Sequence, residues 1–367
     1  METLSQIALT FTPGLGNASI RRLIDLYPDE DIFSLPKSEL KTAFGTHRSL
    51  IDNILNKSGF SRAEEELRYC EQNHIRPLFF TSPDYPERLN RAETDDCPAL
   101  LYCLGSANLN PERSIAIVGT RRATPYGRDN TDRLVRELKP YNTPITSGLA
   151  YGIDTAAHTA ALSHDLPTIA VLGHGLDRIY PAENRPLAKR ILDAGGALLT
   201  EYPNGTAINP RYFPARNRII AALADATVVV EASEKGGALI TAAIAASYHR
   251  DVFAVPGRLS DTYSRGTLNL IATNRALLVR NADDIAFQLG WPMAGQQTAL
   301  TGIEETPHLS ADEQKIANTL KDSDHLTLDE IASATSFSLP KTASLLFNME
   351  MAKVVRTLPG HLYQLCL

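Results

Sequence analysis

Several features are scarce or missing in this chain of 367 residues, and each absence excludes a class of protein. The four cysteines show neither C-x-x-C spacing nor a histidine at zinc-site spacing, so reduced thiols are expected in place of disulfides or metal ligands. There is no run of about 18 apolar residues that could cross a membrane. The N-terminus "METLSQIALTFTPG" lacks the basic segment of an export signal. These absences predict a cytoplasmic protein without a membrane anchor.

An excess of positive charge is also missing. The formal net charge is −6 at pH 7, which argues against a uniformly basic coat for nucleic acid but allows a local basic patch. Apolar residues make up 43% and charged residues 21% of the chain, as in ordinary globular proteins. A chain of this length is expected to form about two or three domains.

Signatures of catalytic sites are the third absence. The sequence contains no H-E-x-x-H, P-loop, G-x-S-x-G or Cys–His signature, and no complete G-x-G-x-x-G fingerprint. Glu201, Asp225 and Glu231 come near the ends of predicted strands, but nothing pairs them as acid and base. We therefore expect a binding protein that is not an enzyme and needs no cofactor or metal.

Residues 1–70 have the pattern of a small helical domain. "FTPGLGNASIRRLIDLY" predicts two helices around a glycine turn, and "LPKSELKTAFGTHRSLIDNIL", with Gly45 in the turn, repeats the pattern more weakly. Two such units would form a bundle like those of SAM or helix-hairpin-helix domains. Their turns either present backbone N–H groups to DNA phosphates or only connect packed helices, and the sequence leaves both interpretations open.

Residues 75–290 predict an α/β domain. Apolar strand-like runs ("SIAIVG", "PITSG", "TIAVLG", "ALLTEY", "TVVVEA", "DVFAVPG", "ALLVR") alternate with amphipathic helical runs from residue 114 onwards. Continuous apolar strands separated by helices indicate a parallel sheet that is covered on both faces. Short strands within residues 75–106 are interpreted as an extension of this sheet. The fold class is therefore an extended Rossmann-like parallel sheet.

The C-terminal part begins after a predicted linker, residues 291–308, which lacks periodicity. Residues 309–367 predict three helices, the first with a capping box of Ser310 and Glu313, and a hairpin that turns at Pro359–Gly360. This order is typical of a winged helix. The third helix offers only Lys341 and Lys353 as cations, which favours a partner-binding or structural role over reading a DNA groove.

Arginines gather where ligands of an open parallel sheet bind, outside the carboxyl ends of the strands. "IAIVGTRR" ends the first strand on Gly119, Thr120, Arg121 and Arg122, in place of a dinucleotide fingerprint. Arginines also follow later strands. The full set at this predicted edge is Arg121, Arg122, Arg211, Arg216, Arg218, Arg258 and Arg265. Consecutive cations suit a ligand with successive charges, such as a phosphodiester chain.

"RYFPARNRII" adds aromatic rings to these cations. Arg216, Asn217 and Arg218 are predicted in the first turn of a helix, where basic residues are unfavourable unless an anion compensates them. Tyr212 and Phe213 place aromatic faces beside them, and arginines with aromatics are typical of a groove for a single nucleic-acid strand. Phe213 is equally well interpreted as a core residue.

Six motifs together resemble the DNA-processing protein A family, known as DprA or Smf: "IAIVGTRRATPYG", "ITSGLAYGIDTAAH", "LGHGLDRIYPAEN", "FPARNRIIAAL", "GALITAAIA" and "VFAVPG". The resemblance covers the sheet domain in order, and the flanking domains match fuller-length members. It implies an extended Rossmann fold and a homodimer. It also implies binding of single-stranded DNA without sequence specificity, and loading of RecA recombinase onto that DNA during natural transformation.

The resemblance also implies where the DNA pocket lies. Its residues would be Gly119, Thr120, Arg121, Ser147, Gly148, Arg211, Phe213, Arg216, Asn217 and Arg218, to which we add Arg122 and Lys235 as candidate contacts. One departure is Lys235-Gly236-Gly237, where the family usually has Ser-Gly-Ser. This difference leaves the contacts of that loop, the RecA contact and the dimer face unassigned.

An enzyme is the alternative from another class. Rossmann-fold phosphoribohydrolases of the lysine-decarboxylase-like group resemble P-G-G-x-G-T-x-x-E, whose glutamate is needed for catalysis. "VPGRLSDTYSRG" has no such glutamate. An oxidoreductase is disfavoured more strongly, because the glycine fingerprint is missing.

Overall fold

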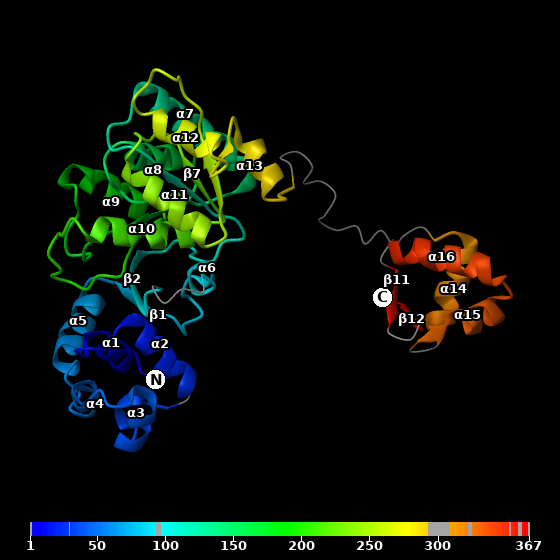
Figure 1. The fold of residues 1–367 in the computed structure, drawn as a ribbon, viewed down its shortest axis with the longest axis horizontal. Coiled ribbons are helices and arrows are strands. Elements are labelled where there is room, and N and C mark those ends of the chain that lie inside the picture. The colour runs from blue at the N-terminus through cyan, green and yellow to red at the C-terminus, as the bar shows by residue number, and fades with distance from the viewer. Residues whose placement is uncertain are drawn as a thin grey trace. The chain divides into compact units, whose positions relative to one another are not determined.

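The computed structural model describes residues 2–28, 30–92, 97–292, 309–321, 325–351, 354–358 and 362–365 (Figure 1). The chain divides into two compact units, Met1–Ala294 and Gly295–Leu367. Within the described ranges, no helix is both long enough and apolar enough to span a bilayer.

A nine-stranded sheet is the centre of the first unit, counted over the described residues. Its strands are β1 (Arg76–Phe79), β2 (Leu100–Gly105), β3 (Ile115–Val118), β4 (Ile145–Ser147), β5 (Thr168–Val171), β6 (Ala197–Thr200), β7 (Ala226–Val229), β8 (Asp251–Ala254) and β9 (Leu277–Leu278). Their order is β1-β2-β6-β5-β4-β3-β7-β8-β9. Strands β3 to β9 are parallel, while β2 lies antiparallel to β6, with Tyr102 opposite Thr200. The seven predicted strands and the two-strand extension are confirmed.

Helices cover both faces of this sheet, which explains why its inner strands are apolar throughout. Alternate residues of β3 point to opposite sides: Ile115 and Ile117 pack with α7 and α8, whereas Ala116 and Val118 pack in the core that includes α10 and α11. The helices are α6 (Glu87–Asn90), α7 (Pro125–Leu138), η2 (Lys139–Tyr141), α8 (Ile153–Ser163), η3 (Ala182–Asn184), α9 (Arg185–Asp193), α10 (Tyr212–Ala222), α11 (Gly237–Ser247), α12 (Arg265–Ala272) and α13 (Ala282–Gln288). Figure 1 shows α10 and α11 side by side on one face.

The N-terminal helices belong to the same compact unit. They are α1 (Thr3–Phe11), α2 (Asn17–Leu26), η1 (Ile32–Ser34), α3 (Lys37–Phe44), α4 (Arg48–Leu55) and α5 (Phe60–Gln72). One hydrophobic core joins them to β1 and β2. Arg21 of α2 donates to the carbonyls of Cys97 (3.2 Å) and Pro98 (3.1 Å), and Arg62 of α5 donates to Asn204 O (2.8 Å). The bundle is therefore anchored to the sheet at several points.

One helix begins earlier than the sequence predicts. α10 begins at Tyr212, so Pro214 lies inside its first turn. Proline is tolerated there because backbone N–H groups of the first turn have no acceptor within the helix, so the N–H that proline lacks is not needed. Arg216, Asn217 and Arg218 consequently lie in the second turn. They therefore do not occupy the positive end of the helix, contrary to the prediction from the sequence, and their role depends on tertiary contacts.

The second unit contains α14 (Ala311–Lys321), β10 (Leu326–Thr327), α15 (Leu328–Thr335), α16 (Leu339–Met351), β11 (Val355–Leu358) and β12 (Leu362–Leu365). The predicted capping box is confirmed: Glu313 N–H donates to Ser310 Oγ (3.3 Å), and Ser310 N–H donates to Glu313 Oε2 (2.9 Å). β10, which the sequence did not indicate, pairs with β12. The predicted turn at Pro359–Gly360, Lys353 and residues 293–308 of the predicted linker lie outside the described residues.

Trp291, the first residue of the predicted linker, packs within the first unit against Tyr141, with ring centroids 5.8 Å apart.

Candidate nucleic-acid interface

A cavity of about 400 Å³ lies at the carboxyl edge of the sheet, between the loop after β3, the first half of α10 and the start of α11. It gathers side chains that lie more than a hundred residues apart in the sequence. Six of the twelve predicted site residues line it: Gly119, Thr120, Arg121, Phe213, Arg216 and Asn217. The cavity is therefore the natural candidate for the predicted DNA pocket.

Arg121 and two aromatic rings form the mouth of the cavity. The Arg121 side chain is exposed, and its Cζ lies 5.6 Å from the centroid of the Phe213 ring. The Phe213 ring packs in turn on Tyr180, with centroids 5.6 Å apart and planes inclined by 37°. Within the described part of the chain, Arg121 has no carboxylate partner. An uncompensated guanidinium over one partly exposed ring, which packs on a second, can meet both a phosphate and a base.

Arg216 and Asp154 form the floor. Arg216 is 3% exposed, and its Nη1 donates to the carbonyls of Gly148 (2.6 Å) and Val171. Burial lowers the pKa of Arg216 to about 10, so it stays charged at neutral pH. Burial raises the pKa of Asp154, while the charge of Arg216 and an N–H from Ala150 (3.3 Å) oppose that rise. The floor is a buried cation whose hydrogen bonds to strand-end carbonyls fix its position.

Ser147 and Gly148 lie behind Arg216 and do not line the cavity. Ser147 is buried, and its hydroxyl donates to Ile117 O (2.6 Å). A Cβ at Gly148 would come within 2.6 Å of Arg216 Nη2, so only glycine leaves room for the guanidinium. These two residues support the guanidinium of Arg216 from outside the cavity lining.

Four other predicted site residues also lie outside the cavity lining. Arg218 makes a bidentate ion pair with Glu201, with both N–O distances 2.7 Å and side chains 14% and 12% exposed. Burial by itself would lower the pKa of Arg218, but the ion pair with Glu201 outweighs it and raises that pKa. Arg122 and Arg211 are exposed at the same edge of the sheet, and Lys235 lies at the rim of an adjoining groove.

Sequence reasoning missed two residues of the site. Tyr180 stands in the loop after β5, which the sequence places at the ligand edge, but its packing against Phe213 depends on tertiary structure. Asp154, on α8, also lines the cavity and accepts from the backbone N–H of Ala150, while His158 on the same helix has its Nδ1 2.7 Å from Thr168 Oγ1.

Comparisons with known proteins agree with this architecture. Residues 76–290 match the family profile described as DNA recombination-mediator protein A, and residues 303–361 match the DprA winged helix domain. Protein Smf of Synechocystis sp. is 32% identical over 98% of this chain and 97% of its own length.

Two solved structures share the fold. DNA processing protein A (DprA) from Streptococcus pneumoniae has 30% identity and a TM-score of 0.69, covering 78% of this chain and 98% of that one. The protein from Helicobacter pylori, studied for its single-stranded DNA binding mode, has 32% identity and a TM-score of 0.52, covering 59% and 95%. The chain belongs to the DNA recombination-mediator protein A family, whose members are called DprA or Smf.

Proposed function

We propose that this chain binds single-stranded DNA, with little dependence on sequence, in the cavity at the carboxyl edge of its sheet. The observation that carries the proposal is Arg121, a cation without a carboxylate partner in the described structure, placed over Phe213, whose ring packs against Tyr180. Guanidinium groups bind phosphate oxygens of any nucleotide, and every base has a face that can stack on an aromatic ring. The single-stranded DNA binding of the H. pylori relative supports the same function.

The winged helix supports single-strand binding over duplex reading only indirectly, because its third helix, α16, carries Lys341 as its one cation between Leu339 and Met351. Lys341 of α16 pairs with Asp312 at 2.7 Å, and its ammonium also lies 4.3 Å from the Phe337 ring centroid. A helix that reads a major groove needs cations aimed at phosphates and bases. A partner-binding or structural role therefore suits this unit better.

The test is a titration of fluorescent oligo-dT and of a blunt duplex of equal length in the same salt. We expect the single strand to bind at least about tenfold tighter, which corresponds to about 1.4 kcal/mol. Equal affinity for both would contradict the proposal. Excess AMP or NAD serves as competitor: displacement of the oligonucleotide at micromolar concentration would favour the alternative of a nucleotide-processing enzyme.

We also propose that the bound strand is handed to RecA recombinase during natural transformation, which places the protein's action in the cytoplasm. The family supports this role, because the chain matches the recombination-mediator profile over its sheet domain. RecA filament growth on oligo-dT, followed by its ATPase activity, should be faster with the protein than without it. A matched reaction with Arg121→Ala should lose the acceleration, and equal acceleration by both proteins would contradict the coupling to this cavity.

A homodimer is proposed on the open edge of the sheet. Leu277 and Leu278 of β9 are 43% and 44% exposed, and Phe287 of α13 is 81% exposed. An apolar edge strand invites pairing with a second copy. Light scattering should give about twice the chain mass of 40.1 kDa, and Phe287→Arg should give the monomer. A monomeric parent protein at micromolar concentration would refute the dimer.

A further inference from the structure

An apolar groove of about 530 Å³ continues from the cavity along the exposed face of α11. The groove and the cavity share Gly236 and Ile240 as lining residues. Leu239 and Ile244 also line the groove, and Ile240 is 46% exposed. The neighbouring charged residues Glu234 and Lys235 line it at the end near the cavity. A ligand leaving the cavity past Gly236 therefore meets an open apolar surface next.

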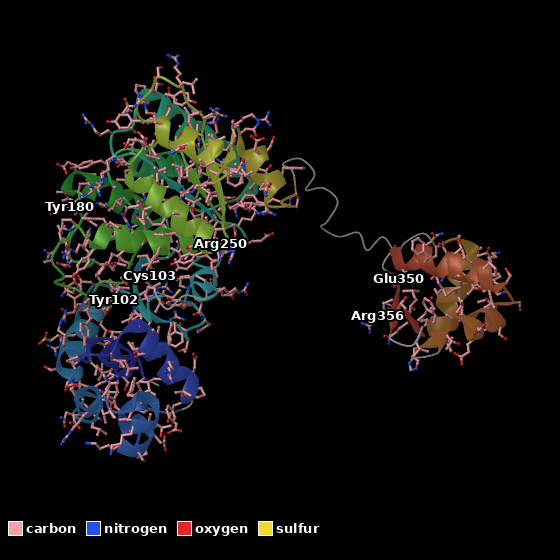
Figure 2. All side chains as sticks on the ribbon, viewed as in Figure 1. Tyr102, Cys103, Tyr180, Arg250, Glu350 and Arg356 are labelled. Atoms are coloured by element: carbon pink, nitrogen blue, oxygen red, sulfur yellow. The ribbon has the colours of Figure 1, made fainter. Side chains whose placement is uncertain are left out.

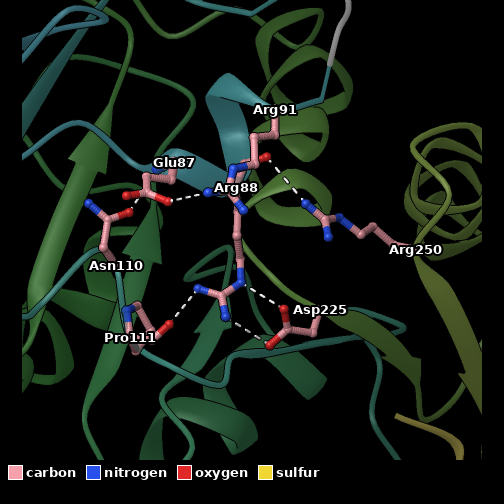
Figure 3. Close-up of a pocket in the computed structure, with 7 residues that line it drawn as sticks. All are labelled: Glu87, Arg88, Arg91, Asn110, Pro111, Asp225 and Arg250. Atoms are coloured by element: carbon pink, nitrogen blue, oxygen red, sulfur yellow. Dashed lines mark hydrogen bonds and ion pairs between the residues drawn. The ribbon is translucent and has the colours of Figure 1, made fainter. Parts of the chain in front are cut away.

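The far end of α11 leads to a cluster of arginines. Ser247, the last residue of α11, lines the groove, and Arg250 follows three residues later. Arg250 lines a second cavity, of about 250 Å³, together with Arg88 and Arg91 (Figure 3). Asp225 and Arg250 directly precede β7 and β8, so this cluster lies at the amino edge of the sheet. Figure 2 accordingly shows Arg250 well apart from Tyr180.

The charges of this cluster do not balance. Arg88 is paired with Asp225, at 2.7 Å and 3.0 Å, and Arg91 is paired with Glu87 at 2.8 Å. Arg250 is left without a carboxylate partner within the described residues. Its guanidinium donates to Arg88 O (3.3 Å), and its Nε is buried with no hydrogen-bond partner there. Burial lowers the pKa of Arg250; the charge of nearby Asp225 opposes this shift, and the charges of Arg88 and Arg91 add to it. An anion at this place would satisfy both the orphan donor and the excess charge.

We propose that the single strand bound in the cavity continues along α11 and that Arg250 holds one of its phosphates at the opposite edge of the sheet. This inference rests on the proposed DNA-binding function and extends it. α11 has 11 residues and is therefore about 16 Å long. At about 3.4 Å per phosphate of a stacked strand, that length corresponds to about five nucleotides. The bases lie over the aliphatic face of α11, and Lys235 is positioned to meet a phosphate on the way.

The experiment compares oligo-dT of about four nucleotides, which is too short to reach from the cavity to Arg250 along α11, with oligo-dT of about twelve, within the usual site sizes of single-strand binders. Lengthening the oligonucleotide should tighten binding to the parent protein at least tenfold beyond the statistical gain from overlapping sites. Arg250→Gln should abolish that gain and leave the affinity for the short oligonucleotide unchanged. The salt slope for the long one should fall by about 0.7, the value for one phosphate contact on a single strand.

Two pairs of variants keep the result interpretable. Arg190→Gln, an exposed arginine of α9, is the control for Arg250→Gln. Ala243→Glu places a carboxylate in the groove, whereas Ala246→Glu makes the same change at an exposed position of α11 outside the groove lining. We expect Ala243→Glu to lose the length-dependent gain and Ala246→Glu to keep it.

The outcomes separate this inference from the proposed function. If Arg250→Gln and Ala243→Glu keep the full gain with length, the path along α11 is refuted while binding in the cavity stands. If the short oligonucleotide does not bind the parent protein, or binds Arg121→Ala equally well, the proposed cavity itself is wrong.

Discussion

Replacing Arg121 by alanine should weaken binding of oligo-dT more than replacing any exposed arginine away from the cavity. Arg121 is exposed, lacks a carboxylate partner in the described structure and lies over Phe213, so its removal leaves no buried partner behind. A hydrogen bond from a charged donor contributes about 1.5–3 kcal/mol. The expected increase in Kd is therefore about tenfold to about 150-fold.

The assay is fluorescence anisotropy of labelled oligo-dT over a series of salt concentrations. The slope of log K against log salt should fall by about 0.7 for one lost phosphate contact. Arg121→Lys keeps the charge but loses the planar, bidentate donor, and should lie between the parent and the alanine variant. Arg190→Ala on α9 is the control and should bind like the parent. If Arg121→Ala keeps the parent affinity at every salt concentration, a different surface binds the DNA.

Four further substitutions test the interpretation of buried groups. Arg216→Met should lower the free energy of unfolding by about 3–5 kcal/mol, because it leaves Asp154 buried without its cation, and adding Asp154→Asn should recover part of the loss in urea denaturation. Arg218→Ala should lower stability by about 2 kcal/mol through loss of the Glu201 pair. It should leave oligo-dT affinity unchanged, and an affinity loss as large as that of Arg121→Ala would assign Arg218 to the DNA site. Burial lowers the pKa of His158 to about 3. The unfolded chain takes up a proton there near pH 6.5, so the stability present above that pH is lost on acidification, by about 2 kcal/mol between pH 7 and pH 5. His158→Gln should flatten this dependence, and an unchanged pH profile would contradict the assignment.

The parallel sheet could be predicted because each of its strands is a continuous apolar run between amphipathic helices. Burial on both faces removes the need for polar residues within such strands, and this leaves a strong signal in the sequence. The start of α10 could not be predicted in the same way. Proline fits both directly before a helix and within its first turn, so the sequence does not show which of these two positions Pro214 occupies.

Part of the candidate site could be predicted from the sequence. The physical reason why a residue could or could not be placed there differs between residues. The rule that ligands meet the carboxyl ends of parallel strands placed Gly119, Thr120 and Arg121 at this edge, and the structure puts them in the lining of the cavity. The same rule cannot tell a free arginine from a paired one. Arg218 meets Glu201 at the end of β6, and this pairing depends on how α10 packs across the sheet.

The most direct measurement is photocrosslinking of oligo-dT that carries 4-thiothymidine, followed by mass spectrometry of the digested complex. We expect crosslinks to the segments around Tyr180 and Phe213, because their partly exposed rings stand at the mouth of the cavity beside Arg121. Crosslinks confined to α14, α15 and α16, with none in the segments lining the cavity, would contradict binding of single-stranded DNA at the carboxyl edge of the sheet.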